Sequence, residues 1–223
     1  MSRDTKIVAT LGPASSDAEV LERMICAGVD VVRLNFSHGK REDHVARAQL
    51  VREVAARVGR PVGILADLQG PKIRIGKFVD GKIWLEKGAR FILEAKCELG
   101  NEERVGLDYK DLTHDVATGS VLLLDDGRIV LIVDRVLGAE IFTTVRHGGE
   151  LSDNKGINRQ GGGLSAPALT AKDMEDIRTA SSIGVDYVAV SFPKSAADMY
   201  MAKQLIHAAG GHARTIAKIE RVE

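Results

Sequence analysis

Short apolar runs alternate with amphipathic stretches at both ends of the chain. The runs are rich in Val, Ile and Leu, and glycine or proline lies close to most of their ends. Such runs are typical of strands that are buried on both faces in a parallel sheet. We expect strands at residues 6–10, 31–36, 62–68, 187–192 and 215–220.

The amphipathic stretches between these runs predict helices. The first has apolar residues at a 3.6-residue period, a cap at Ser15 or Ser16, and a stop at Gly28. Thr170, followed three residues later by Asp173, predicts the start of another helix in the second half of the chain. We expect helices ending at Gly28 and at residues 42–58, 170–182 and 196–209.

The αβ pattern repeats within the chain. The segment AGVDVV at residues 27–32 is echoed by IGVDYV at 183–188, and each marks the end of a helix followed by a buried strand. Repeated units of this kind favour an α/β fold, a partial (β/α)8 TIM-type barrel with five of its strands. A doubly wound open sheet is the alternative, but no strand is followed by a GxGxxG turn.

The middle of the chain has a different pattern. Asp80-Gly81 and Asp126-Gly127 separate apolar runs, which predicts hairpins, and no helical period is evident. The Gly-rich stretch 148–163 predicts a mobile return linker. We therefore expect a small antiparallel β-barrel inserted as a lid. The predicted domains are a barrel part at 1–70, the inserted β domain at 71–166, and the barrel continued at 167–223.

Composition narrows the functional classes. The 31 basic residues balance 31 acidic ones, so there is no net charge to favour nucleic acid or an anionic membrane. Cys26 and Cys97 are far apart and predict reduced thiols. No apolar stretch is long enough for a signal peptide or a membrane span. We expect a cytoplasmic protein.

Polar residues gather where the predicted strands end, which in a barrel is the rim that carries the working residues. Arginines, lysines and carboxylates on one rim suit a phosphorylated substrate and a divalent metal. The rim residues are Thr10 and Pro13 after the first strand, Arg33, Asn35, Ser37 and His38 on the second, Asp67, Lys72 and Arg74 after the third, and Lys218 and Glu220 on the fifth.

Several of these residues also have structural interpretations. Lys218 and Glu220 share a strand face, so a plain ion pair would explain both. His38 could cap a loop. Lys72 and Arg74 could be solvated charges. The residues alone leave these alternatives open.

Six segments, in this order, resemble the pyruvate kinase family: KIVATLGPAS, VVRLNFSHG, DLQGPKIR, DNKGIN, LTAKDMEDI and TIAKIE. The resemblance covers essentially the whole chain, and details such as LQGPKIR are similar to bacterial members. It implies a glycolytic kinase that transfers a phosphoryl group from phosphoenolpyruvate to ADP. It also implies Mg²⁺ and K⁺ as cofactors and a homotetrameric parent protein.

The resemblance implies a role for each matching residue. Lys218 resembles the catalytic lysine, which binds substrate together with a residue matched by Arg33, and Glu220 resembles a ligand of the catalytic Mg²⁺. Phosphate and nucleotide contacts are matched by Thr10, Pro13, His38, Arg74 and Lys155. Side-chain ligands of a potassium ion are matched by Asn35, Ser37 and Asp67.

The chain departs from the family pattern in two ways. Lys72 stands where potassium-dependent members carry glutamate, and Leu68 where they carry threonine. Because a lysine ammonium could supply the charge of the ion, we expect turnover without potassium. The chain ends at Glu223, before the family's second metal carboxylate and its C-terminal domain, so we expect this piece alone to be inactive.

Two other functions compete with this one. A phosphoenolpyruvate-using lyase or mutase on the same barrel would share the phosphate and metal residues, but it would need neither ADP nor the β domain. A truncated, non-catalytic fragment would bind nucleotide or phosphate without turnover.

Overall fold

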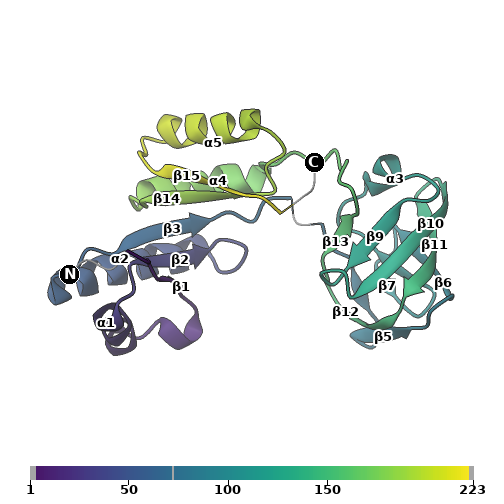
Figure 1. Ribbon diagram of the computed structural model, residues 1–223, viewed down its shortest axis with the longest axis horizontal. Helices are drawn as coiled ribbons and strands as arrows, with labels where there is room; N and C mark the ends of the chain where they lie inside the picture. Colours follow the sequence, from purple (N-terminus) through teal and green to yellow (C-terminus); the bar gives the residue numbers. More distant parts are fainter. Residues whose placement is uncertain (1–3, 72, 221–223) are drawn as a thin grey trace. The chain divides into compact units, whose positions relative to one another are not determined.

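The computed structural model describes residues 4–71 and 73–220, which fall into two compact units (Figure 1). The αβ unit comprises residues 4–71 and 167–220, and the β unit comprises residues 73–166. Each unit has its own hydrophobic core and is described by itself.

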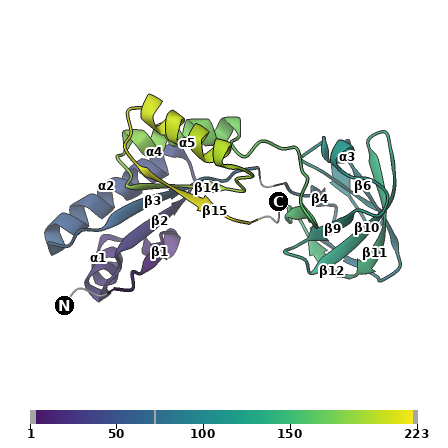
Figure 2. The same cartoon turned by 45° about the horizontal axis from the view of Figure 1, so that its top comes forward.

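A five-stranded parallel sheet forms the centre of the αβ unit. Its strands lie in the order β1-β2-β3-β14-β15, which is also their order along the chain. A doubly wound sheet would reverse its strand order at a switch point, so this alternative is wrong. The sheet is curled, and its helices lie on one face (Figure 2). The strands are β1 Val8–Thr10, β2 Val31–Asn35, β3 Gly63–Asp67, β14 Tyr187–Ser191 and β15 Arg214–Lys218.

Four helices cover the apolar face of this sheet. They are α1 Ala18–Ala27, α2 Arg41–Val58, α4 Ala171–Ser182 and α5 Ala196–Ala208, with the 3₁₀ turn η1 Pro13–Ser15 before the first. Val32, Ile64 and Val188, one from each central strand, are fully buried in the core shared with the helices. Because side chains alternate along a strand, the neighbours of these residues face the other side of the sheet.

The observed helix starts agree only in part with those predicted from the sequence. Thr170 caps α4 as expected, since its side chain accepts a hydrogen bond from the Asp173 backbone N–H. The cap of α1 is Asp17, so the prediction of Ser15 or Ser16 is wrong. Both serine hydroxyls donate instead to the backbone carbonyl of Gly12, which keeps them in the preceding turn.

The repeated GVD segment places an aspartate at the start of a strand in each copy. The Asp30 carboxylate accepts a hydrogen bond from the Ile7 backbone N–H at 2.7 Å. Asp186 accepts one from the Ile64 backbone N–H, also at 2.7 Å. Each aspartate thus ties its own strand to the strand beside it, which gives the sequence repeat a structural reason.

The β unit is built around a six-stranded sheet in the order β13-β9-β10-β11-β6-β8, with the two-stranded sheets β12-β5 and β4-β7 beside it. The pairs β6–β8 and β4–β7 are parallel, so the sheets are mixed rather than wholly antiparallel. The strands are β4 Lys77–Phe78, β5 Lys82–Leu85, β6 Arg90–Glu94, β7 Leu99–Gly100, β8 Arg104–Gly106, β9 Val121–Leu124, β10 Ile129–Leu137, β11 Glu140–His147, β12 Gly149–Ser152 and β13 Ile157–Arg159.

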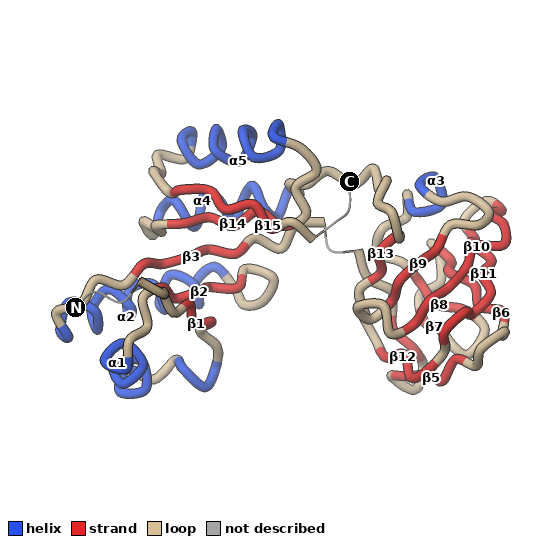
Figure 3. The backbone as a smooth tube through the Cα atoms, in the orientation of Figure 1, coloured by secondary structure: helices blue, strands red, loops and turns tan. Residues whose placement is uncertain are grey.

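Three expectations for the β unit need correction. Asp126-Gly127 does join the antiparallel pair β9–β10, but Asp80-Gly81 is only a turn, because β4 pairs with β7 and β5 with β12. A short helix, α3 Leu112–Asp115, was not expected (Figure 3). The segment 148–163 is not a simple linker, since it contributes β12 and β13 to the sheets.

Among the described residues, no helix combines the length and the apolar character needed to cross a membrane.

Candidate active site

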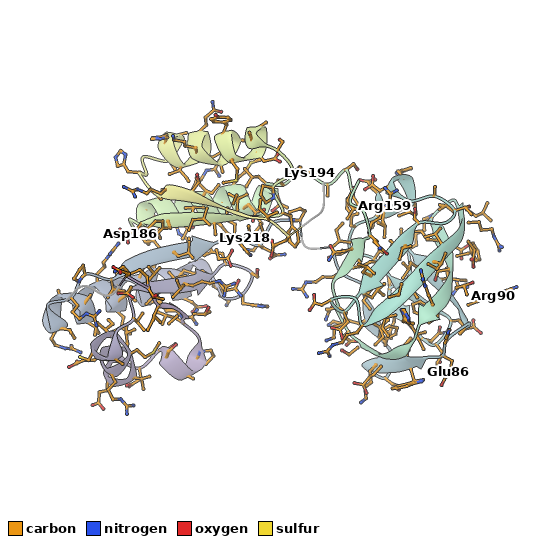
Figure 4. The ribbon with its side chains drawn as sticks, viewed as in Figure 1. Glu86, Arg90, Arg159, Asp186, Lys194 and Lys218 are labelled. Carbon is orange, nitrogen blue, oxygen red and sulfur yellow. The ribbon has the colours of Figure 1, made fainter. Side chains whose placement is uncertain are left out.

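A cluster of charged side chains lies near the carboxyl ends of β2, β3 and β15. One of its members, Lys218, is labelled in Figure 4. The centre of the cluster is Asp67, the last residue of β3, whose side chain is only 4% exposed. The parallel register sets Asn35 beside Asp67, and Ser191 beside Lys218 on the neighbouring pair of strands. The sheet therefore brings residues from distant parts of the sequence to one edge.

Asp67 pairs with a cation on each side. Oδ2 accepts a 2.7 Å hydrogen bond from Arg33 Nε and lies 2.6 Å from Arg33 Nη2. Oδ1 lies 3.1 Å from Lys218 Nζ and receives no hydrogen bond of good geometry among the described residues. A buried carboxylate needs such partners because leaving it unpaired costs several kcal/mol, on the order of 3–5. Asp67 therefore fixes the positions of both cations.

Arg33 and Lys218 keep part of their surface open. Their side chains are 29% and 31% exposed, so both can still contact a ligand. Arg33 Nη1 also donates to Thr10 Oγ1 at 3.0 Å, which ties in the end of β1. Two oriented cations at one edge suit an anion that carries several oxygen atoms.

Glu220 stands beside Lys218. Its Oε1 lies 3.5 Å from Lys218 Nζ, and its Oε2 accepts a 3.2 Å hydrogen bond from the Phe192 backbone N–H. The Glu220 side chain is 34% exposed. The plain Lys218–Glu220 ion pair considered from the sequence is therefore only a weak contact, and Lys218 has closer partners.

Two residues of this edge did not emerge from the sequence. Ser191 Oγ accepts from Lys218 Nζ at 2.9 Å and donates to the Leu68 carbonyl at 2.6 Å. Phe192 has a left-handed backbone, with φ of 54°, a costly conformation for a bulky residue. The signal was available, because Ser191 and Phe192 end a predicted strand as the other rim residues do. Neither side chain is charged, so the pattern of charged residues alone does not point to them.

The segment after β2 turns back on itself. Asn35 Oδ1 accepts a 3.1 Å hydrogen bond from the Ser37 backbone N–H, and the Asn35 carbonyl accepts one from the His38 backbone N–H at 3.3 Å. Pro13 lies in η1, after the end of β1. Asn35 ends β2, and the other residues follow β1 or β2, so all of them lie at the same edge of the sheet as the charged cluster.

The remaining predicted residues belong to the β unit. The Arg74 guanidinium donates to the Asn154 carbonyl at 2.8 Å, and Lys155 Nζ lies 2.8 Å from Asp125 Oδ1. A β-bridge between Arg74 and Gly156 brings Arg74 and Lys155 close together within this unit. Burial raises the pKa of Asp108, whose carboxylate accepts the Arg74 backbone N–H. Lys72 lies outside the described residues.

The donor atoms of this edge fit metal ions only with help from a ligand. Among the described residues, no three His, Cys, Asp or Glu side chains gather closely enough to hold a metal. Glu220 can supply one carboxylate oxygen, which suits Mg²⁺ because this ion keeps several waters or substrate oxygens. Asn35, Ser37 and Asp67 offer amide, hydroxyl and carboxylate oxygens to a larger cation.

Two hollows of the αβ unit lie away from the cluster. One of about 630 Å³ lies along α2 and α4 and includes Arg41 and Arg52. Another of about 520 Å³ includes Asp186 and Arg214, at the opposite end of the strands from Lys218 (Figure 4). Neither holds a buried, doubly paired carboxylate, so the arrangement of charge, rather than the size of a hollow, identifies the candidate site.

Known proteins resemble this chain along its whole length. The family model described as pyruvate kinase, barrel domain, matches residues 2–223. The chain is 55% identical to a pyruvate kinase of Haemophilus influenzae over 223 residues, covering 99% of this chain and 47% of the relative. It is 56% identical to pyruvate kinase II of Salmonella typhimurium, covering 99% of this chain and 46% of that protein. A pyruvate kinase of Mycobacterium tuberculosis is 44% identical, covering 100% of this chain and 47% of its own length. The chain thus spans about half the length of these relatives.

Proposed function

Because the chain belongs to the pyruvate kinase family, we propose that its parent protein transfers the phosphoryl group of phosphoenolpyruvate to ADP, giving pyruvate and ATP. The observation that carries the proposal is the Arg33–Asp67–Lys218 cluster, in which one buried carboxylate orients two partly exposed cations. Phosphoryl transfer needs mainly positioning and neutralisation of negative charge, and such a cluster supplies both.

Each residue has a distinct task in this proposal. Arg33 binds the phosphoryl oxygens, and Lys218 stabilises the charge on the transferring group and on the enolate that remains. The bond between phosphorus and the enol oxygen breaks as an ADP oxygen bonds to phosphorus, and the enolate then takes up a proton to become pyruvate. Glu220 would hold Mg²⁺, which when bound neutralises charge on the phosphoryl oxygens.

The residues of this chain support the binding of potassium less strongly than the binding of Mg²⁺. Asn35, Ser37 and Asp67 offer suitable oxygens, but both oxygens of Asp67 already lie within 3.1 Å of a cationic nitrogen. Lys72, at the position of a glutamate in potassium-dependent members, would add a further positive charge. We therefore propose that the enzyme works without potassium.

We propose that the β unit acts as a lid. Arg74 and Lys155 lie together in it and would contact the nucleotide phosphates on closure, while Thr10, Pro13 and His38 contact the nucleotide from the αβ unit. A closed lid excludes water, which protects the transferring phosphoryl group from hydrolysis. The proposed parent protein is a cytoplasmic homotetramer.

The test is an assay of the full-length protein that contains this chain. With phosphoenolpyruvate, ADP and Mg²⁺, we expect ATP and pyruvate in equal amounts, and no pyruvate when ADP is omitted. Pyruvate or a rearranged product without ADP would instead support a lyase or mutase. Lys218→Met is expected to abolish turnover, whereas Lys203→Met, at an exposed position on α5, is the matched control. Full turnover by Lys218→Met would refute the proposal.

The isolated chain of residues 1–223 is assayed under the same conditions. We propose that it is inactive, since only one of the metal carboxylates expected from the family falls within it. Turnover by this piece at a rate close to that of the full-length protein would refute this part of the proposal.

A further inference from the structure

The segment that follows β2, residues 36–39, is held from the helix side by the first turns of α2 and α4. His44, in the first turn of α2, is 2% exposed, and its ring stacks on Phe36. The two ring centroids are 4.0 Å apart and the planes differ by 9°. A histidine buried this completely in an apolar stack needs a reason beyond packing, because a leucine or phenylalanine would pack without the cost of burying polar atoms.

The ring also makes a polar contact with the same segment. The His38 backbone is a polar neighbour of the ring and raises its pKa. Nε2 is the ring nitrogen nearest this segment, since a Cβ placed on Gly39 would lie 3.6 Å from it. Nδ1 is buried and has no hydrogen-bond partner among the described residues. A proton on Nε2 would face the backbone of this segment, whereas a proton on Nδ1 would have no acceptor among the described residues.

The charges around His44 favour the neutral ring. Burial, Arg47 and Lys172 lower its pKa. Asp176 and the His38 backbone raise it. A protonated imidazole would carry a second N–H on the buried Nδ1, which has no partner among the described residues.

Lys172, in the first turn of α4, holds the other end of the segment. Its Nζ donates to the Phe36 carbonyl at 2.6 Å and pairs with the Asp176 carboxylate at 2.5 Å. The helices α2 and α4 thus both contact this short segment. His44 stacks on the Phe36 ring, and Lys172 donates to the Phe36 carbonyl. Neither side chain belongs to the charged cluster around Asp67.

We propose that His44, supported by Lys172, is a positioning residue that fixes the backbone of residues 36–39 and thereby the binding of ADP. This inference rests on the proposed function, in which His38 contacts the nucleotide. Arg33 and Lys218, by contrast, are oriented by the Asp67 carboxylate, whereas the segment contacts Asp67 only through the Phe36 backbone N–H and the Asp67 carbonyl. The predicted signature is therefore selective, with weaker nucleotide binding and unchanged handling of phosphoenolpyruvate.

The experiment compares two substitutions of His44 in the full-length protein. His44→Phe keeps a stacking ring and removes the ring nitrogens, one of which faces Gly39, whereas His44→Gln places an amide N–H near the position of Nε2. His207→Phe, on an exposed part of α5, is the matched control. For His44→Phe we expect the KM for ADP to rise about fivefold, the size of one polar contact, with kcat and the KM for phosphoenolpyruvate within about twofold. His44→Gln restores most of the affinity.

A second measurement does not depend on activity. Amide hydrogen exchange in a peptide that covers residues 36–39 is expected to be about fivefold faster in His44→Phe than in the wild type, and unchanged in His207→Phe. If His44→Phe does not fold, Lys172→Met is measured in its place, with Lys203→Met as its control. The same selective rise in the KM for ADP and the same faster exchange are expected.

The outcomes separate the two proposals. A wild-type protein that makes no ATP from phosphoenolpyruvate and ADP refutes the proposed function, and the exchange experiment then decides whether His44 holds the loop. If the wild type is active, equal changes in both KM values, an unchanged KM for ADP, or unchanged exchange in the variant overturns the role of His44.

Discussion

The pairing of Asp67 with two cations makes the strongest quantitative prediction. Asp67→Asn keeps the shape of the side chain but leaves Arg33 and Lys218 facing each other without the negative charge between them. Removing one partner of a buried ion pair costs about 3–5 kcal/mol. Because Arg33 and Lys218 are 29% and 31% exposed, water recovers part of this loss. We expect the free energy of unfolding to fall by about 2 kcal/mol.

Urea unfolding of the full-length protein measures this change. With a slope of about 1–3 kcal/mol per molar urea, a loss of this size lowers the midpoint by about 1 M. The turnover number is also expected to fall by about tenfold or more, because Lys218 loses the group that orients it. The matched control is Glu22→Gln, since Glu22 pairs with Arg57 at the same 2.6 Å but the two side chains are 41% and 55% exposed.

The comparison tests burial as the cause. An exposed pair contributes about 0–1 kcal/mol, so Glu22→Gln is expected to leave the midpoint nearly unchanged. If Asp67→Asn destabilises the protein no more than Glu22→Gln, the argument from burial is refuted. If stability falls while turnover stays at the wild-type value, Asp67 stabilises the fold but does not orient Lys218 for the proposed reaction.

Three further predictions concern the ion requirement, the pH dependence and a helix cap. Turnover of the full-length enzyme is expected to be equal in sodium and potassium buffers, since Lys72 supplies a positive charge. A strict potassium requirement would contradict this. The pKa of His44 is lowered in the folded state, so its unfolded form binds more protons below pH 6.5 and stability is lost as the pH falls through this range. His44→Gln is expected to remove this part of the pH dependence in denaturation measured from pH 8 to pH 5, and an identical pH profile would rule the assignment out. Thr170→Ala is expected to lower the free energy of unfolding by about 1 kcal/mol through loss of the α4 cap, whereas Thr170→Ser keeps the hydroxyl and serves as the control. Equal stability of these two variants would show that the cap contributes nothing.

The αβ unit was predictable because its signals are local. The apolar runs and the stops at Gly28 and Gly59 lie within a few residues of the elements that they define, and all five expected strands of this unit are present. The strand-end rule likewise drew attention to Arg33, Asp67 and Lys218 before any geometry was known. What it could not supply was the central place of Asp67, which depends on contacts between strands that are far apart in sequence.

The β unit was less predictable because its pairings are non-local. Asp80-Gly81 forces a turn, but the local sequence does not show that β5 pairs with β12 rather than with β4. Gly148 begins the stretch 148–163, whose glycines predict a mobile linker. A Cβ at this position would lie 2.0 Å from the Leu85 carbonyl oxygen, so this glycine allows two backbones to approach closely.

The β unit separates the two parts of the αβ unit in the sequence, and this has a consequence during synthesis of the chain. The Ile64 backbone bonds to Asp186, a residue 122 positions later in the chain. At ribosomal rates of about 5–20 residues per second, β3 emerges roughly 6–24 seconds before β14, its neighbour in the sheet. During this interval the backbone N–H and C=O groups along one edge of β3 are unpaired. Such an edge promotes aggregation and binding by chaperones. The β unit, whose core is its own, is complete before β14 appears and can fold while the first three strands wait for their partners.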